Sequence, residues 1–323
     1  MNSHQDIIEK LNAFGKMQKP FIFFIDFEME KPRLFSLEEL EQEEIHIHFP
    51  TFQTKKIEYD ATKIELQITP STMQEYADLF SAVQQNLQQG NSYLTNLTVQ
   101  TPIHLSTELE PIFQQAKAKY KIQFTSEWVC FSPETFIEIK GNKIYAYPMK
   151  GTIDASISNA EQVLLQDKKE TAEHYTIVDL IRNDLSIVAT DVRVEKFRYI
   201  ETITTAQKNL LQMSSQISGV LPENFQEHLG TILYSLLPAG SISGAPKKKT
   251  VDIIHEVEKE SRGYYTGVCF YYDGENVDSC VLIRFIEKTA TGFVYKSGGG
   301  ITIHSEVEKE YQELLDKIYV PVF

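Results

Sequence analysis

A lysine at position 150 lies in a segment that favours a tight backbone turn. Residues 145–153 read Tyr-Ala-Tyr-Pro-Met-Lys-Gly-Thr-Ile. Pro148 fixes its own φ, and Gly151 permits a sharp change of direction. A lysine beside a glycine is most often a solvated loop residue, but a deprotonated lysine amine is also a nucleophile. The segment alone leaves both interpretations of Lys150 open.

Two pairs of glutamates, each pair three residues apart, fall within segments of helical periodicity. Glu170 and Glu173 form the first pair, and Glu310 and Glu313 form the second. Residues three apart on a helix share a face, so each pair directs two carboxylates the same way. Such pairs are usually solvated helix surface, but carboxylate oxygens are also the ligands that Mg²⁺ prefers. Each pair is therefore either plain surface or part of a metal site.

Three further features concern the binding of an anion. Arg284 lies in the otherwise apolar run Val281-Leu-Ile-Arg-Phe285, which predicts a strand, and a charged side chain there is rarely buried without a partner. The glycines at 298–300 would let backbone N–H groups approach a ligand, or they form a sharp turn between a strand and a helix. In residues 240–247 only three residues separate the two glycines, so nucleotide binding of the Walker type is rejected.

The composition is that of a globular protein with an acidic surface. Of the 323 residues 42% are hydrophobic, which is ample for a core, and the net charge is −14. The acidic excess argues against nucleic acid or a membrane surface as a partner, because both require basic patches. No apolar run is long enough to span a bilayer, and no secretory signal is visible. Cys130, Cys269 and Cys280 lie among apolar residues, so we expect reduced, buried thiols in a cytoplasmic protein.

The periodicity predicts antiparallel strands with helices grouped between them, and therefore an α+β fold. No linker or repeat divides the chain, so we expect one catalytic domain over residues 1–323. Asp273-Gly274 and Thr291-Gly292 are hairpin signals between strands. Strands are predicted at 19–29, 92–99, 127–131, 135–139, 143–147, 264–272, 278–286 and 292–297. Helices are predicted at 74–89 and near 159–184, 223–236, 246–257 and 305–317.

Six motifs, in this order along the chain, resemble those of the chorismate-utilising enzymes, the family of anthranilate, aminodeoxychorismate and isochorismate synthases. They are Pro148-Met-Lys-Gly-Thr152, Lys169-Glu-Thr-Ala-Glu-His174, Ile177-Val-Asp-Leu-Ile-Arg-Asn-Asp184, Pro238-Ala-Gly-Ser-Ile-Ser-Gly-Ala-Pro-Lys247, Gly298-Gly-Gly-Ile301 and Glu310-Tyr-Gln-Glu313. The resemblance implies two large, stacked, mostly antiparallel sheets with helices outside and the active site in the cleft between the sheets. The short region 1–70 lacks the Leu-Leu-Glu-Ser motif that binds tryptophan in longer members, so inhibition by tryptophan is not expected.

By this resemblance, the two glutamate pairs form a magnesium site. Glu173 and Glu313 correspond to direct ligands, and Glu170 and Glu310 correspond to carboxylates that act through water. An open position on Mg²⁺ would take the ring carboxylate of chorismate, and the ion would withdraw electron density from the ring as it reacts. Lys317, one turn past Glu313, either balances these carboxylates or is a plain surface lysine.

The same resemblance implies a cradle for chorismate, which is a dianion. Arg284 corresponds to a residue that binds the carboxylate of the enolpyruvyl arm as a bidentate fork. Tyr265 corresponds to a tyrosine that hydrogen-bonds the same group. The other positions implied in substrate binding are Thr152, Ser243, Gly298, Gly299 and Gly300.

Glu134 and Lys150 are the positions to which the resemblance gives catalytic roles. Glu134, in Phe131-Ser-Pro-Glu-Thr-Phe136, corresponds to the general acid that protonates the departing C4 hydroxyl, a step that typically contributes ~10²–10⁴-fold. In aminodeoxychorismate synthases the lysine at the position of Lys150 attacks C2 of chorismate, and ammonia then adds at C4 and expels it. Anthranilate synthases carry alanine there. Attack requires a neutral amine, so the pocket must lower the pKa of the lysine.

The sequence therefore predicts the aminodeoxychorismate synthase branch of the family, in folate and para-aminobenzoate biosynthesis. Its ammonia is expected from a separate glutamine amidotransferase, because the chain has no glutaminase Cys/His constellation. Leu94 replaces the lysine with which isochorismate synthases activate water, and Gln212 stands where anthranilate synthases carry histidine. Phe285 and Tyr264 also depart from residues common in the family. The alternatives left open are anthranilate synthase component I and a non-catalytic scaffold for a glutaminase.

Overall fold

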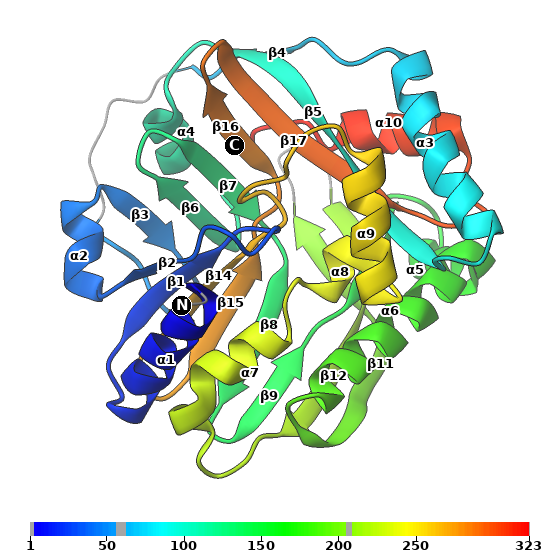
Figure 1. Ribbon diagram of the computed structural model, residues 1–323. Coiled ribbons are helices and arrows are strands. Elements are labelled where there is room, and N and C mark those ends of the chain that lie inside the picture. The colour runs from blue at the N-terminus through cyan, green and yellow to red at the C-terminus, as the bar shows by residue number, and fades with distance from the viewer. Residues whose placement is uncertain (1–2, 56–62, 205–208, 323) are drawn as a thin grey trace. The chain divides into compact units, whose positions relative to one another are not determined.

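The computed structural model describes residues 3–55, 63–204 and 209–322 (Figure 1). The chain divides into two compact units, each assembled from segments that are distant in sequence. Unit 1 comprises Met1–Phe23, Thr135–Ser241 and Phe270–Ser279, and unit 2 comprises Phe24–Glu134, Ile242–Cys269 and Cys280–Phe323. That the whole chain acts as one catalytic domain stays a prediction.

Two antiparallel sheets form the framework, and they confirm the predicted α+β class. The strands are β1 (Phe21–Ile25), β2 (Arg33–Phe35), β3 (Ile45–His48), β4 (Leu66–Ile68), β5 (Leu94–Leu105), β6 (Tyr120–Phe124), β7 (Trp128–Ser132), β8 (Thr135–Lys140), β9 (Lys143–Ala146), β10 (Met149–Asp154), β11 (Thr190–Thr204), β12 (Asn209–Val220), β13 (Gly244–Ala245), β14 (Val268–Tyr272), β15 (Val277–Val281), β16 (Phe285–Thr289) and β17 (Gly292–Ile301). Within the described residues, the first sheet has the order β10-β12-β9-β8-β15-β14-β1-β2, with β11 paired to β12. The second has the order β13-β5-β17-β16-β7-β6-β3, with β4 paired to β5, and lies entirely in unit 2.

The helices occur where helical periodicity predicts them and also in regions for which no helix was predicted. They are α1 (Ser3–Lys16), α2 (Leu37–Gln42), α3 (Met73–Gln88), α4 (Leu109–Gln115), α5 (Ala160–Gln166), α6 (Lys168–Ser186), the 3₁₀ turn η1 (Phe225–His228), α7 (Leu229–Ser235), α8 (Gly240–Ser243), α9 (Lys247–Val257) and α10 (Val307–Asp316). The single helix predicted near 159–184 is two helices. Asp167 ends α5 and caps α6, because its side chain accepts a hydrogen bond from the N–H of Glu170.

One predicted strand is wrong, and one of the two interpretations of the glycines at 298–300 is excluded. The run 278–286 is not one strand, because β15 ends at Val281 and β16 begins at Phe285. Between them the chain leaves the first sheet and enters the second. Gly298, Gly299 and Gly300 do not form a turn, because they lie inside β17 and pair with residues 96–98 of β5.

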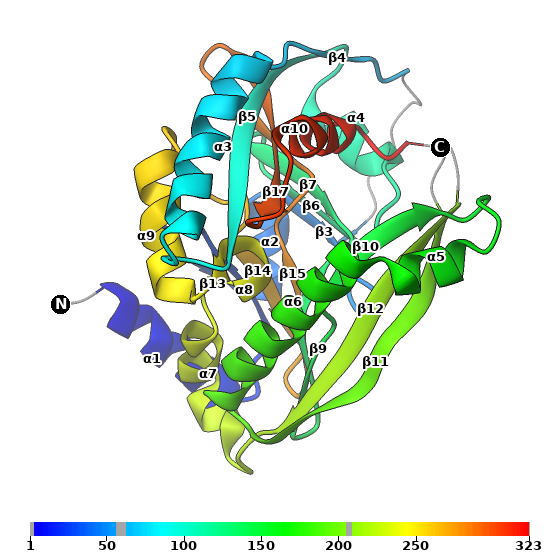
Figure 2. The same ribbon diagram turned by 90° about the vertical axis from the view of Figure 1, so that its right-hand side faces the viewer.

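In unit 1, helix α6 covers strands β10, β11 and β12 (Figure 2). Its apolar positions Ile177, Val178, Ile181 and Leu185 are buried at helical spacing. The helix therefore rests on the sheet along one face. That face also carries Glu173, which is buried although it is charged.

In unit 2, helices α3 and α10 pack on each other and on strand β17, as Figure 2 shows. A capping box starts α3, since Thr72 accepts from the N–H of Glu75 and the Glu75 carboxylate accepts from the N–H of Thr72. The buried apolar cluster beneath the two helices contains Tyr76, Phe80, Val83, Leu87, Leu97, Ile301 and Leu314. This packing holds α10 and its glutamates against β17.

The three cysteines are free and fully buried, as predicted. They lie on strands β7, β14 and β15. Among the helices of the described residues, none is long and apolar enough to cross a membrane.

Candidate active site

Lys150 occupies a β-bulge in unit 1, not a free loop. Between Met149 and Thr152 strand β10 has one residue more than its partner β12, which runs from Ser214 to Gln212. Gly151 takes φ +77°, a left-handed conformation that favours glycine. A bulge re-aims the side chains around it. The Pro-x-Lys-Gly pattern was the visible signal of this local geometry.

The bulge directs Lys150 toward helix α6. The Nζ atom of Lys150 lies 3.1 Å from Oε2 of Glu173, and the side chains are 27% and 8% exposed. A Cβ on Gly151 would lie 2.9 Å from Oε2 of Glu170. Glycine at 151 therefore serves both the backbone turn and the close approach of α6. Thr152 faces Gln212 across the β10–β12 pair, in the same part of unit 1.

The carboxylates of α6 fit a bound cation. Oε1 of Glu173 is buried and has no hydrogen-bond partner among the described residues, and Nζ of Lys169 lies 3.8 Å from it. Burial raises the pKa of Glu170, the charge of Glu173 raises it further, and Lys150 and Lys169 oppose both effects. A buried carboxylate oxygen without a partner is costly, so a divalent ion would supply what this oxygen lacks.

The carboxylates of α10 lie in unit 2 beside the glycine segment of β17. Glu310 is buried, and the side chain of Glu313 is 54% exposed. Nζ of Lys317 lies 2.7 Å from Oε1 of Glu313 and donates to the carbonyl of Gly298 at 2.7 Å. A Cβ on Gly299 would lie 3.6 Å from Oε2 of Glu310 and 3.7 Å from Oε1 of Glu313. The structure thus brings the predicted glycines and the second glutamate pair together.

No cluster of three or more His, Cys, Asp or Glu side chains with metal-binding geometry occurs in residues 3–55, 63–204 and 209–322. Each glutamate pair provides two carboxylates within its own unit. Mg²⁺ commonly keeps several waters and binds through one or two carboxylates. The predicted roles of direct and water-mediated ligands stay predictions.

Glu134 and Arg284 both lie in unit 2 at places where the chain changes sheet. Glu134 follows β7 of the second sheet and precedes β8 of the first, and Arg284 lies between β15 and β16. The N–H of Val281 donates to the carbonyl of Glu134 at 3.2 Å, and the N–H of Phe131 donates to that of Arg284 at 3.1 Å. The backbone of each residue is therefore hydrogen-bonded to the segment that leads to the other. Where a chain passes from one sheet to another, its side chains need not alternate between two faces as they do along a strand.

Arg284 does not lie on a strand, which corrects the sequence prediction. Its φ is +55°, a left-handed conformation that is strained for a residue with a side chain. Nη1 of Arg284 donates to the carbonyl of Lys317 at 3.0 Å, and the guanidinium lies 5.2 Å from the ring centroid of Tyr319. The guanidinium is half-buried and also hydrogen-bonds the side chain of Tyr295. Its five N–H groups exceed these contacts, so it keeps other donors for an anion.

Tyr265, Ser243 and Leu94 are buried in unit 2. Burial raises the pKa of Tyr265, so its hydroxyl stays protonated and can donate a hydrogen bond. The departures Phe285 and Tyr264 have a structural explanation. Phe285 stacks on Trp128 at 5.0 Å between ring centroids, and Tyr264 packs on the same indole at 5.5 Å.

Arg262 was not singled out from the sequence, although it is the most extensively hydrogen-bonded side chain near Tyr265. It is 2% exposed and pairs with Glu258. The spacing i, i+4 between Glu258 and Arg262 was the only signal, and that spacing is common on protein surfaces.

Comparison with known proteins gives a consistent result. A family model described as chorismate binding enzyme matches residues 13–322. An uncharacterized PabA-like protein of Pasteurella multocida is 50% identical over 319 residues, which cover 98% of each chain. The aminodeoxychorismate synthase component 1 of Escherichia coli is 31% identical over 262 residues, which cover 76% of this chain and 56% of that relative.

A solved structure supports the fold. The anthranilate synthase component I of Streptococcus pneumoniae has a TM-score of 0.70 and 20% identity, and the match covers 92% of this chain and 79% of that one. At this level of identity the likeness concerns the fold alone.

Proposed function

Because the chain belongs to the family of chorismate binding enzymes, we propose that it is a Mg²⁺-dependent aminodeoxychorismate synthase, component I. It replaces the C4 hydroxyl of chorismate with an amine and serves folate and para-aminobenzoate biosynthesis. The observation that carries this proposal is Lys150, aimed by a β-bulge at the buried carboxylate of Glu173. A lysine that is mostly withdrawn from water can act as a nucleophile once its amine is neutral. A cation bound at the Glu173 carboxylate would favour that neutral form, because it offsets the negative charge that stabilises the ammonium.

In the proposed reaction, Nζ of Lys150 forms a bond to C2 of chorismate while the C4–O bond breaks. Both ring double bonds shift, from C1=C2 and C5=C6 to C1=C6 and C4=C5, and Glu134 gives its proton to the leaving hydroxyl, which departs as water. Ammonia then adds at C4, both double bonds return to their original places, and the C2–N bond to Lys150 breaks. The enolpyruvyl group is retained throughout, and the product is 4-amino-4-deoxychorismate.

The proposed metal ligands are Glu173 and Glu313, with Glu170 and Glu310 acting through water. Support comes from Oε1 of Glu173, which is buried without a hydrogen-bond partner among the described residues and fits a cation. Bound Mg²⁺ would hold the ring carboxylate of chorismate and weaken the hold of Glu173 on the Lys150 ammonium. Arg284 and Tyr265 would bind the enolpyruvyl carboxylate, and Thr152, Ser243, Gly298, Gly299 and Gly300 would line the substrate.

The ammonia would come from a separate glutamine amidotransferase. Glutamine hydrolysis of that kind requires a reactive cysteine, and Cys130, Cys269 and Cys280 are all fully buried on strands. The chain itself offers no exposed thiol for this purpose.

Product identification tests the proposal. Purified protein is incubated with chorismate, Mg²⁺ and ammonium, and the products are analysed by mass spectrometry. We expect a compound with an amine in place of the C4 hydroxyl and an intact enolpyruvyl group. Anthranilate and pyruvate would instead establish the anthranilate synthase alternative. Chorismate left unconsumed with ammonium, and also with an added glutaminase subunit, would favour the scaffold alternative.

A further inference from the structure

The segment from Glu258 to Gly267, here called the Arg262 loop, carries Tyr265 and lies in unit 2. We propose that Arg262 is a positioning residue that holds Tyr265 in place for substrate binding. This inference rests on the proposed function, since it concerns the same site. The inference adds to the site a buried guanidinium that holds neighbouring segments in place and does not touch the substrate.

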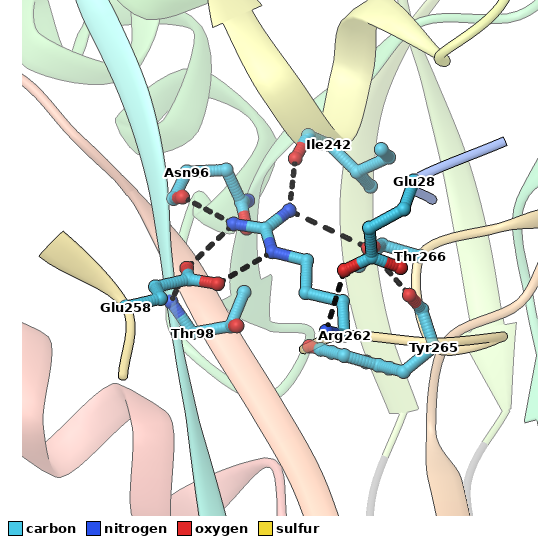
Figure 3. Close-up of polar contacts among 8 residues, drawn as sticks. All are labelled: Glu28, Asn96, Thr98, Ile242, Glu258, Arg262, Tyr265 and Thr266. Carbon is cyan, nitrogen blue, oxygen red and sulfur yellow. Dashed lines mark hydrogen bonds and ion pairs between the residues drawn. The ribbon is translucent and has the colours of Figure 1, made fainter. Parts of the chain in front are cut away.

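The guanidinium of Arg262 has no donor left for a substrate (Figure 3). Nε donates to Oε2 of Glu258 at 2.8 Å, and Nη2 donates to Oε1 of Glu258 at 2.6 Å and to the carbonyl of Asn96 at 2.7 Å. Nη1 donates to the carbonyl of Ile242 at 2.9 Å and to Oγ1 of Thr266 at 3.4 Å. Arginine has five N–H groups, and five contacts use them. Arg262 therefore acts on the site through its neighbours.

These contacts join three segments, two of which carry predicted substrate residues. The carbonyl of Ile242 immediately precedes Ser243, and Oγ1 of Thr266 also donates to the carbonyl of Tyr265 at 2.6 Å. The N–H of Thr98 on β5 donates to Oε1 of Glu258 at 2.8 Å, so the ion pair between Arg262 and Glu258 is also hydrogen-bonded to the backbone of β5. One fork-shaped side chain thus sets the spacing of α8, β5 and the Arg262 loop.

The backbone of the loop has other tethers that do not depend on the guanidinium. Glu28 accepts hydrogen bonds from the N–H groups of Arg262 at 2.9 Å and Gly263 at 3.0 Å. Nζ of Lys296 donates to the carbonyl of Arg262 at 3.0 Å, and the hydroxyl of Tyr264 donates to the carbonyl of Lys31 at 2.8 Å. A chain with an altered guanidinium should therefore fold with the loop attached.

The loop has room to shift if the guanidinium is lost. Glu258, Ser261, Arg262, Tyr265 and Lys296 all line one cavity of about 350 Å³. A segment packed on every side is held in place by van der Waals contacts. A segment beside a cavity lacks some of these contacts and depends more on its hydrogen bonds and ion pairs. A buried ion pair contributes little net stability, whereas the rigid fork of the guanidinium fixes the directions of the five contacts of Arg262. Arg262 is thus expected to affect ligand affinity more than folding.

Arg262→Lys is the direct test, because it keeps the charge and removes the fork. Chorismate affinity is measured by the fluorescence of Trp128, the only tryptophan in the chain, which stacks on Phe285 beside Arg284. We expect Kd and KM to rise about tenfold while kcat changes less than about threefold. Glu258→Gln, which keeps the side-chain shape, is the second variant and should shift Kd in the same direction by about threefold.

A double-mutant cycle separates positioning from general destabilisation. If Arg262 acts through Tyr265, adding Arg262→Lys to Tyr265→Phe should raise Kd less than about twofold further. The matched control is Ile112→Ala, which removes a fully buried side chain from the core cluster around α4 in the same unit. It should lower the melting temperature at least as much as Arg262→Lys and leave Kd unchanged.

Two results would overturn the inference. The first is a full tenfold rise in the Kd for chorismate when Arg262→Lys is added to Tyr265→Phe, because the two substitutions would then act on binding independently. The second is a rise in Kd for Ile112→Ala equal to that for Arg262→Lys. Because binding is read without turnover, these results do not depend on which product the enzyme forms. A wild-type chain that binds chorismate but forms another product would refute only the proposed reaction.

Discussion

Glu173 on α6 and Glu313 on α10 are each the second member of an i, i+3 glutamate pair, but their side chains have opposite surroundings. On α6, the side chain of Glu173 is 8% exposed, and its lysine partner, Lys150, comes from strand β10. On α10, the side chain of Glu313 is 54% exposed, and its partner, Lys317, is four residues further along the same helix. The ion pair between Lys150 and Glu173 exists only because the tertiary fold brings a strand to a helix. The ion pair between Lys317 and Glu313 would form on an isolated helix.

This difference shows where the chemistry concentrates. An exposed i, i+4 ion pair contributes about 0.3–0.5 kcal/mol. A desolvated pair costs free energy unless every group is satisfied, and Oε1 of Glu173 is not satisfied by the described residues. Retention of such an arrangement favours a catalytic role for Lys150, and it predicts that the two lysines respond differently to mutation.

The largest expected effect is that of Lys150→Ala. Loss of the nucleophile should lower kcat for amination of chorismate by about 10³-fold or more, whereas Lys317→Ala should cost about tenfold, since it removes only a neighbouring charge. Rates of product formation, measured by mass spectrometry, test both variants. Equal losses, or an unchanged product and rate in Lys150→Ala, would break the comparison and refute the covalent role.

Next in size is the effect of neutralising the carboxylates. Glu173→Gln should weaken Mg²⁺ binding about 100-fold, because it removes the negative charge of the carboxylate whose buried Oε1 has no hydrogen-bond partner among the described residues. Glu313→Gln should weaken it less, because that carboxylate is already solvated and paired. Isothermal titration with Mg²⁺, in the absence of chorismate, measures this directly. If Glu313→Gln has the larger effect, the order of importance of the two helices is reversed.

The glycines of β17 provide a third contrast. A Cβ at Gly298 would clash with the carbonyl oxygen of Leu97, so Gly298→Ala should lower the free energy of unfolding by about 1–3 kcal/mol. Gly299→Ala meets its neighbours at 3.5 Å or more and should fold normally. Because the added methyl group would face Glu310 and Glu313, Gly299→Ala should lower the rate of chorismate amination instead of the stability. Urea unfolding and steady-state kinetics of both variants separate the two roles.

The smallest expected effect concerns the thiols, all three of which belong to unit 2. Burial raises the pKa of the Cys130 thiol, so it stays protonated and unreactive at pH 8.5. Alkylation of the native protein should be negligible up to that pH, and all three thiols should react in denaturant. Because unit 1 has no cysteine, thiol reactivity during unfolding reports on unit 2 alone. Comparison with circular dichroism then shows whether the two units unfold together.

Much of the framework was predictable from local patterns. The apolar spacing of Tyr76, Phe80, Val83 and Leu87 predicted α3 almost to its ends, since amphipathic periodicity is a local property. Strands β7, β8 and β9 were predicted within about a residue or two. The i, i+3 glutamate pairs do lie on helices, as their spacing indicated.

Other features could not be predicted, because they depend on contacts between distant segments. The run Val281–Phe285 resembles one strand, yet it breaks at Arg284 because the chain changes sheets there. The glycines 298–300 resemble a turn, but the carbonyl of Leu97 on β5 is what requires glycine at 298. Arg262 has no distinctive sequence context, and only the convergence of Glu258, Asn96, Ile242 and Thr266 on it reveals its role.

The sequence by itself determined the α+β class, the buried thiols, the glutamate spacing and the motifs that indicate the family. These are encoded in residue type and short-range periodicity, which survive without tertiary contacts. Only the tertiary structure decided that Lys150 meets Glu173, that Oε1 of Glu173 is buried without a hydrogen-bond partner among the described residues, and that Arg262 joins three segments. Burial and the pairing of charges are properties of a packed chain, because they depend on which distant residues exclude water from one another.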